Sequence, residues 1–424
     1  MYKPRLADAL LKRKLLGVGA VLIEGLKWCG KTTTAEQQAR SVIYMDNPAT
    51  RINNIKLAET EPSLILAGDT PRLIDEWQIA PELWDAVRFT VDHRKEEGQF
   101  ILTGSAVPQI SQETKEKMHT GTGRIARLKM RTMSLWESGD SNGCVSLQEI
   151  LNGKKQSGTV TSDLSEIAYL CCRGGWPKAT LQDRSIALDR AEDYYQAIVN
   201  FDIARASKLV INKDRIKKLL RSYARFQGCQ TSVKAITADI KSGESDTLDS
   251  RTVQTYIESL KQIYVIEDMP AWNPNLRSKS AIRTSETRYF SDPSIATSSL
   301  GIGPEDLIKD LNTFGFIFET MCVRDLRVYA ESLGGDVYHY RDSTGLECDA
   351  VIHFRNGKYG LIEIKLGGDT LIEEGVKNLL KLKNTIDTNK IGEPNFMMVL
   401  TATGNFAFQR ADGVYIVPIT ALKN

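Results

Sequence analysis

The sequence predicts an α/β protein in three successive parts: a parallel sheet with its helices, a helical segment, and a second mixed α/β segment. Short apolar runs alternate with helical patterns through residues 1–135, which is typical of a parallel sheet covered on both faces. Residues 166–300 read as mostly helical, and strand-like runs return in 301–424. We therefore expect domains at 1–137, 166–300 and 301–424, with a Gly- and Ser-rich linker at 138–165 around one short helix.

The composition limits the class of protein. With 42% hydrophobic and 25% charged residues, the chain of 424 residues resembles a water-soluble globular protein. A formal net charge of +2 excludes a general polycation, so any nucleic-acid affinity must come from local basic patches. No apolar run approaches the ~18 residues that a membrane span needs, and the N-terminal residues read as an amphipathic helix rather than a secretory signal. Seven scattered cysteines without a CxxC pair favour a reducing compartment, so we expect a cytoplasmic protein with no membrane partner.

Five apolar runs are the candidate strands of the first domain. Each is bounded by polar or turn-forming residues and lies next to a helical pattern, as strands of a parallel sheet do. The runs are AVLIEG at 20–25, SVIYMD at 41–46, LILAG at 64–68, RLIDE at 72–76 and QFILTGS at 99–105.

A phosphate-binding pattern follows the first run. Residues 25–32 satisfy GxxxxGK[ST] between an apolar run and a helical pattern, which is the context this motif requires. The glycines let backbone N–H groups surround a β-phosphate, Lys31 supplies a charge to the β- and γ-phosphates, and the Thr32 hydroxyl is a ligand for Mg²⁺. The predicted nucleotide-binding residues are Gly25, Cys29, Gly30, Lys31, Thr32, Thr33 and Asp75.

A pair of acids completes the predicted site for ATP and Mg²⁺. Asp75 and Glu76 end the run RLIDE, and the carboxyl ends of parallel strands are where ligands bind. We expect Asp75 to hold the Mg²⁺ shell together with Thr32, and Glu76 to act as the general base for the attacking water. At the end of QFILTGS, Ser105 or alternatively Thr103 would hydrogen-bond that water or the γ-phosphate, although simple capping of the strand end is an equal alternative.

One arginine is a candidate for completing the site of a neighbouring subunit. Arg124 lies in the segment GTGRIARLKMR, and an arginine donated by a second subunit can neutralise charge in the transition state of phosphoryl transfer. The alternative is an ordinary surface arginine. The first interpretation implies that the chain can form a homo-oligomer.

These motifs carry a family resemblance. The runs IEGLKWCGKTTTA, LIDEWQ, PELWDAVR, ILTGSA and GTGRIARLKMRTMSLWES resemble a prokaryotic group of AAA+-type ATPases in which a C-terminal domain of unknown function follows the ATPase. The resemblance covers nearly the whole chain. It implies an AAA+-type P-loop fold and ATP binding, and it implies little about the biological role.

The middle segment reads as a winged-helix module, which the resemblance also implies. Residues 213–227, 231–242 and 249–263 have helical periodicity, and two strand-like runs, IYVIEDM and TRYFSD, follow as a hairpin. In such a module the third helix can enter a major groove of DNA while the hairpin contacts phosphates. The hairpin loop carries a basic excess, namely Arg277, Lys279, Arg283 and Arg288. A protein-binding role for the module is the alternative.

The last segment contains an acid–acid–lysine pattern. Glu363 and Lys365 are two apart in YGLIEIK, so they share one face of a strand, and Asp349 lies far enough upstream for a hairpin to bring it alongside. Two carboxylates holding Mg²⁺ beside a lysine can support phosphodiester cleavage. The pattern looks like the PD-(D/E)xK signature of restriction-endonuclease-like folds, with Glu319 as the acid of the leading helix, although Cys348 stands where the signature has proline.

The leading hypothesis is therefore a Mg²⁺-dependent ATPase that acts on DNA through a winged helix and a nuclease-like domain. The rival is a nucleotide-dependent regulatory switch in which both later domains are inactive interaction modules. A scaffold that binds ATP without turnover is disfavoured by the intact Glu76.

Overall fold

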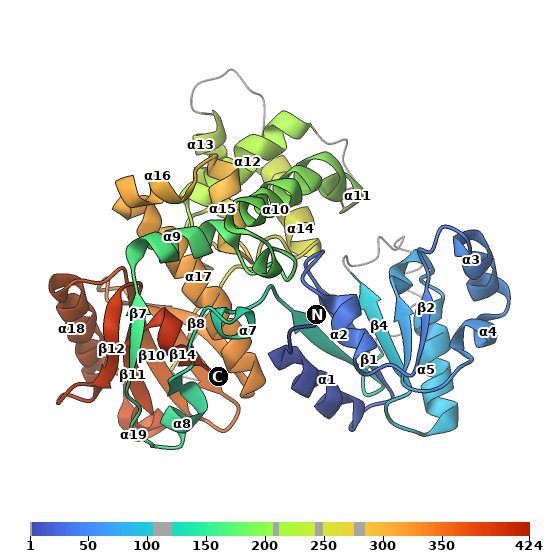
Figure 1. Ribbon diagram of the computed structural model, residues 1–424, viewed down its shortest axis with the longest axis horizontal. Coiled ribbons are helices and arrows are strands. Elements are labelled where there is room, and N and C mark those ends of the chain that lie inside the picture. The colour runs from blue at the N-terminus through green and yellow to red at the C-terminus, as the bar shows by residue number, and fades with distance from the viewer. Residues whose placement is uncertain (1, 105–120, 207–211, 242–248, 275–284) are drawn as a thin grey trace. The chain divides into compact units, whose positions relative to one another are not determined.

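The chain forms two compact units, which are described separately. A computed structural model describes residues 2–104, 121–206, 212–241, 249–274 and 285–424. The first unit comprises residues 1–131 with 262–264, and the second comprises 132–261 with 265–424 (Figure 1). No helix in these described ranges is long and apolar enough to cross a membrane.

The first unit is built on a five-stranded sheet in which every neighbouring pair is parallel, with the order β2-β3-β4-β1-β5. This confirms the predicted parallel sheet. The strands are β1 (Ala20–Gly25), β2 (Ser41–Tyr44), β3 (Arg72–Asp75), β4 (Phe100–Gly104) and β5 (Ile125–Met130). The helices are α1 (Leu6–Leu15), α2 (Lys31–Glu36), α3 (Arg51–Thr60), α4 (Pro62–Leu66) and α5 (Leu83–Arg94).

The central strands are apolar on both faces because helices cover both. Ala20 and Leu22 of β1 pack into a core that α3, α4 and α5 complete, while Val21 and Ile23, on the other face, are also fully buried. A strand that is buried on both sides reads as a continuous apolar run. The runs that form β1, β3 and β4 were therefore recognisable from the sequence.

Two expectations for this unit were wrong. The run LILAG belongs to helix α4, which begins at Pro62 and packs Ile65 and Leu66 against the sheet. A proline fits the first turn of a helix, where its missing N–H costs nothing. Strand β5 was missed because it alternates buried and accessible positions, and Arg127 and Lys129 interrupt its apolar pattern.

The second unit contains a seven-stranded mixed sheet with the order β7-β12-β13-β11-β10-β9-β8. Pairs β10–β11 and β11–β13 are parallel, and the other neighbouring pairs are antiparallel. The strands are β7 (Gly158–Ser162), β8 (Gly335–Arg341), β9 (Glu347–Phe354), β10 (Tyr359–Lys365), β11 (Phe396–Thr401), β12 (Gly404–Gln409) and β13 (Val414–Pro418). Helices α17 (Leu311–Ser332) and α18 (Asp369–Thr385) both contact β9 and β10.

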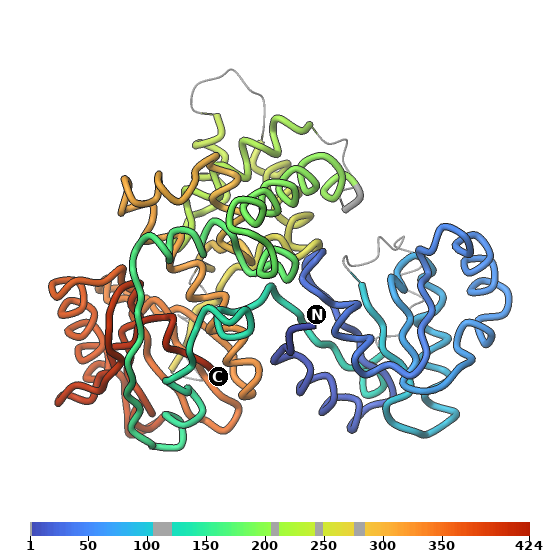
Figure 2. The backbone as a smooth tube through the Cα atoms, in the orientation of Figure 1, coloured from blue at the N-terminus to red at the C-terminus, as the bar shows by residue number. Residues whose placement is uncertain are grey.

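The stretch expected to be a linker at 138–165 is instead part of this unit. It contains the expected short helix, α8 (Leu147–Leu151), but β7 pairs with β12, and β6 (Val145–Ser146) pairs with β14 (Leu422–Lys423). Figure 2 shows this green segment beside the red strands from the other end of the sequence. Gly- and Ser-rich sequence can form an edge strand when a partner strand supplies the hydrogen bonds.

The described part of the segment before α17 is mostly helical, as expected for residues 166–300. The α-helices are α9 (Leu164–Arg173), α10 (Arg184–Ala197), α11 (Ile203–Ala206), α12 (Lys213–Arg225), α13 (Val233–Lys241), α14 (Ser250–Gln262), α15 (Pro293–Leu300) and α16 (Pro304–Lys309). A buried charge cluster lies among them. Arg324 contacts Asp325 at 2.7 Å and Asp292 at 3.3 Å, and each of these side chains is at most 1% exposed.

Candidate functional site

The phosphate-binding loop connects β1 to α2, and two glycines determine its shape. Gly25 has a φ of 151°, and a Cβ at this position would lie 2.0 Å from the carbonyl oxygen of Met130. Gly30 has a φ of 100° and immediately precedes α2. Both conformations lie in the region that favours glycine, so the loop requires this residue type at each end.

Lys31 is buried in this loop without an acidic partner. The side chain is 6% exposed, and its ammonium donates to the carbonyl oxygens of Gly25 at 3.0 Å and Leu26 at 2.6 Å. In the described part of the chain, no carboxylate lies within ion-pair distance of it, and the Gly30 N–H has no acceptor. A buried cation beside an unused N–H donor is an arrangement that attracts an anion.

Asp75 lies at the same edge of the sheet and joins two threonines. Its Oδ1 atom accepts hydrogen bonds from the hydroxyls of Thr32 at 2.7 Å and Thr103 at 2.6 Å. Strand β4 lies between β1 and β3, so Thr103 near its end stands between the phosphate-binding loop and Asp75. A hydroxyl beside a carboxylate is the oxygen donor set that Mg²⁺ prefers, so Thr32 and Asp75 fit this ion.

Glu76 follows β3 directly and takes a left-handed conformation, with a φ of 55°. Its N–H donates to the Thr103 hydroxyl at 3.3 Å, and its carboxylate accepts a hydrogen bond from Gln78. A bulky residue in this region of φ is uncommon and costs about 1–3 kcal/mol, so the surrounding contacts hold it there.

Of the other two predicted residues, one is not described by the structure and one lies elsewhere in the first unit. Ser105 lies outside the described residues, and Thr103, the alternative to it, makes the contacts given above. Arg124 lies at the amino ends of the strands, because Ile125 pairs with Ala20 at the start of β5 and β1. The phosphate-binding loop and Asp75 lie at the carboxyl ends. The side chain of Arg124 donates to Asp92 at 2.8 Å. Arg124 therefore takes no part in the site of its own subunit, and its action on a neighbour's site stays a prediction.

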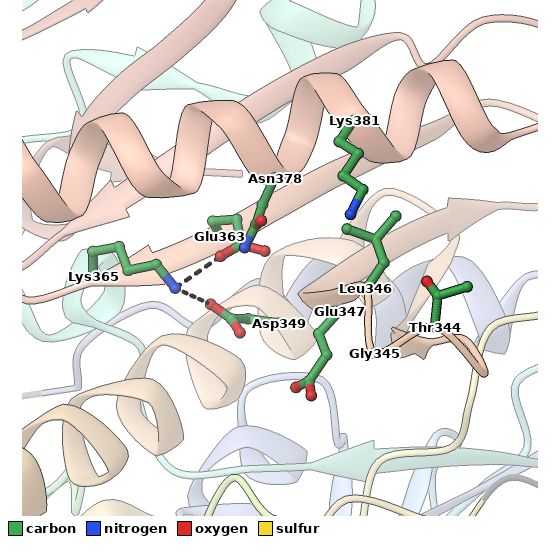
Figure 3. A pocket seen from close by; sticks show the side chains of 9 residues that line it. All are labelled: Thr344, Gly345, Leu346, Glu347, Asp349, Glu363, Lys365, Asn378 and Lys381. Atoms are coloured by element: carbon green, nitrogen blue, oxygen red, sulfur yellow. Dashed lines mark hydrogen bonds and ion pairs between the residues drawn. The ribbon is translucent and has the colours of Figure 1, made fainter.

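The second unit brings together three of the four residues of the acid–lysine pattern. Asp349 of β9 lies one position beyond the paired residues Ala350 and Ile362, which places it opposite Glu363 of β10. The Lys365 ammonium lies 2.7 Å from Glu363 and 3.4 Å from Asp349 (Figure 3).

These side chains line an open cleft of about 280 Å³, here called the acid–lysine cleft. Its lining residues are Thr344, Gly345, Leu346, Glu347, Asp349, Glu363, Lys365, Asn378 and Lys381. Asn378 and Lys381 come from α18, and no motif in the sequence singled them out. In the described ranges, no group of three or more His, Cys, Asp or Glu side chains is arranged to hold a metal ion.

Burial controls the electrostatics of the acid–lysine cleft. Glu363 is 2% exposed, and burial together with the charge of Asp349 raises its pKa to about 8. Burial opposes the charge on Lys365, but Asp349 and Glu363 outweigh that effect and raise the pKa of the lysine above its ordinary value. At neutral pH the lysine is therefore charged, and it lies beside Glu363, whose raised pKa favours the protonated form.

Glu319 lies near this cleft but does not line it. It is on α17, and its carboxylate accepts a hydrogen bond from the hydroxyl of Tyr289. Burial and the charge of Asp349 raise the pKa of Glu319 to about 8. Glu319, the predicted fourth acid, is therefore close enough to interact electrostatically with Asp349, while its hydrogen bond is to Tyr289.

The helical segment contains the expected order of three helices and a hairpin. After α12, α13 and α14, residues 265–269 pair with 287–291 in an antiparallel manner, through the bridges Ile266–Phe290 and Met269–Thr287. Arg288, expected at a phosphate, instead contacts Asp268 at 2.6 Å and is 11% exposed. The other basic residues expected in the hairpin loop, Arg277, Lys279 and Arg283, lie outside the described residues.

Comparison with known families assigns only the first unit. The family described as "AAA domain" matches residues 18–138. Two families described as domains of unknown function match residues 164–306 (DUF8612) and 314–422 (DUF4143). The first unit is therefore similar to AAA domains, which agrees with the resemblance found in the sequence, whereas the matches to the second unit carry no function.

Individual relatives add coverage but no activity. Uncharacterized proteins of Mycobacterium tuberculosis and Mycobacterium bovis are each 22% identical over 386 residues, which is 90% of this chain and 78% of theirs. Among solved structures, a Walker-type ATPase of Pyrococcus abyssi is similar with a TM-score of 0.43 and 12% identity, over 70% of this chain and 96% of that one.

Proposed function

We propose that this protein is a Mg²⁺-dependent ATPase whose first unit hydrolyses ATP. One observation carries the proposal: the buried Lys31, which has no acidic partner in the described part of the chain, faces the same edge of the sheet as Asp75 and its two threonines. A positive loop beside an acidic oxygen donor set is complementary to a phosphate chain that carries a divalent cation.

Each residue has a distinct role in the proposed reaction. Lys31 and the loop N–H groups bind the β- and γ-phosphates, and Thr32 and Asp75 would hold Mg²⁺, which supplies positive charge against the phosphates. Glu76 accepts the proton of the attacking water. Thr103 hydrogen-bonds to both Asp75 and the backbone of Glu76, so it holds the metal ligand and the general base at a fixed distance from each other.

Phosphate release in Mg²⁺ tests the proposal. Lys31→Ala should abolish turnover and weaken ATP binding, whereas Glu76→Gln should retain ATP and lose turnover. The matched controls are Lys12→Ala and Glu59→Gln, which remove the same charges from exposed positions of this unit. Turnover by Glu76→Gln at the wild-type rate would remove Glu76 as the base, and a wild type that neither binds nor hydrolyses ATP would refute the function.

A second activity is proposed for the acid–lysine cleft, namely metal-dependent action on the phosphodiester backbone of DNA. The observation that favours it is the convergence of Asp349, Glu363 and Lys365 in one open cleft. ATP hydrolysis in the first unit would then drive or license this action, with the helical segment as the DNA contact.

Nicking of supercoiled DNA in Mg²⁺ or Mn²⁺ separates this activity from its rival. Cleavage that disappears in Asp349→Ala, with ATP turnover stimulated by DNA, supports the nuclease. If DNA changes neither turnover nor its own integrity, the second unit is an interaction module and the protein is a nucleotide-dependent switch. Glu305→Gln, an exposed change in the same unit, controls for loss of charge.

A further inference from the structure

The N-terminal segment, which precedes the residues that match the AAA family, contacts the carbonyl side of the phosphate-binding loop. Arg5 precedes α1 and lies outside the residues that match the AAA family, yet its guanidinium is 6% exposed and points into the first unit. One nitrogen donates to the carbonyl oxygen of Cys29 at 2.8 Å, and the other donates to that of Arg131 at 2.9 Å. The side chain thus joins the loop to the end of β5.

The contact with Cys29 has a consequence for the opposite side of the same peptide bond. The carbonyl of Cys29 and the N–H of Gly30 belong to one planar trans peptide, in which the two groups point in opposite directions. A cation that holds the carbonyl therefore fixes the direction of the N–H. It also polarises the peptide, because hydrogen bonds in a chain strengthen one another. That N–H has no acceptor in the described part of the chain, so it is available to a ligand.

Neighbouring contacts hold Arg5 in this position. Asp8 accepts from the backbone N–H of Arg5 at 2.8 Å and from the hydroxyl of Tyr2 at 2.6 Å. The Tyr2 hydroxyl also lies 3.0 Å from the hydroxyl of Thr34 in α2, the helix that follows the loop. The N-terminal segment therefore contacts both the loop and its helix.

We propose that Arg5 is a positioning residue for nucleotide binding, which orients and polarises the Gly30 N–H toward a phosphate of the bound nucleotide. The proposal rests on ATP binding at the loop. Arg5 itself touches no phosphate, because it lies on the carbonyl side of the peptide. Its fork of donors serves two carbonyls at once, a geometry that lysine cannot reproduce.

Calorimetric titration with ATP and with ADP, combined with KM and kcat, tests this role. Arg5→Gln should weaken binding of both nucleotides about tenfold, or about 1.4 kcal/mol, and should raise KM more than it changes kcat. Arg5→Lys, which keeps the charge and one donor direction, should recover part of the loss. The matched control Arg13→Gln, an exposed change on α1, should bind like the wild type.

The outcomes distinguish this role from general stabilisation and from failure of the proposed function. A lowered melting temperature in Arg5→Gln with unchanged affinity and KM would overturn the proposal, as would an equal loss in Arg13→Gln. If Arg5→Gln does not fold, Arg5→Lys decides: an affinity equal to that of the wild type refutes the role. A wild type that binds neither nucleotide refutes the ATPase proposal instead.

Discussion

Replacement of Glu319 by glutamine tests the electrostatics around the acid–lysine cleft, because it removes one charge and keeps the shape. Folding raises the pKa of Glu319 from 4.5 to about 8, chiefly through burial and the charge of Asp349. The unfolded chain therefore loses this proton at a lower pH than the folded chain does. The free energy of unfolding falls as the pH rises from about 4.5 to about 8, and the penalty is complete above that range.

The size of the effect follows from the pKa difference. At ~1.4 kcal/mol per unit, the ionised carboxylate costs about 5 kcal/mol at pH 9 as an upper limit. Asp349 and Glu363 interact electrostatically with Glu319, so part of this penalty depends on their charges. We therefore expect about half of the upper limit. Glu319→Gln should thus be about 2–3 kcal/mol more stable than the wild type at pH 9 and nearly equal to it at pH 4.

Scanning calorimetry at a series of pH values measures this difference. For a unit of this size, about 2–3 kcal/mol corresponds to a rise of about 3–5 °C in the melting temperature of the second unit. Glutamine can still accept the hydrogen bond from Tyr289, so lost packing does not obscure the result. A stability difference that is the same at pH 4 and pH 9, or one that Glu305→Gln reproduces, would show that the reasoning is wrong.

Three further predictions concern other parts of the molecule. Arg324→Met should lower the free energy of unfolding of the second unit by about 3–5 kcal/mol, measured by calorimetry, because it leaves Asp292 and Asp325 buried without their cation. Gly25→Ala should destabilise the first unit by about 1–3 kcal/mol and abolish ATP binding in titration, because the new Cβ would overlap a backbone oxygen. Arg124→Ala should leave the affinity for ATP unchanged in the same titration, because Arg124 lies at the amino ends of the strands; a loss of affinity would contradict that placement.

Sequence patterns predicted those strands of the first unit whose own residues form an apolar run. Strand β1 is apolar on both faces, so its run of letters carries the information directly. Strand β5 does not, because its outward positions hold Arg127 and Lys129 and only its partner strand makes it part of the sheet. The same reason explains why β7 was taken for a linker.

The candidate sites divide in the same way. The phosphate-binding loop is one contiguous stretch, so its residues could be named in advance, and the two-residue spacing of a strand placed Glu363 with Lys365. The partners of individual side chains could not be named. The contacts of Arg5 with the loop and of Arg288 with Asp268 join positions that are 20 or more residues apart, and no local pattern records such pairs.

The phosphate-binding loop and the acid–lysine cleft each contain a lysine, which is buried in the loop and partly buried in the cleft. The partners of the two lysines differ, so the electrostatic potential of the two sites differs as well. Lys31 faces carbonyl oxygens, whose partial charges do not cancel an ammonium, so the loop keeps a positive field that favours phosphate. Lys365 faces two carboxylates, and the acid–lysine cleft as a whole contains three carboxylates and two ammonium groups. When all are ionised, this lining repels a phosphodiester. In that state, which is reached above the raised pKa of Glu363, the proposed action on DNA would need a divalent cation in the cleft to offset the excess negative charge, whereas the positive field of the Lys31 loop favours a phosphate chain without a cation.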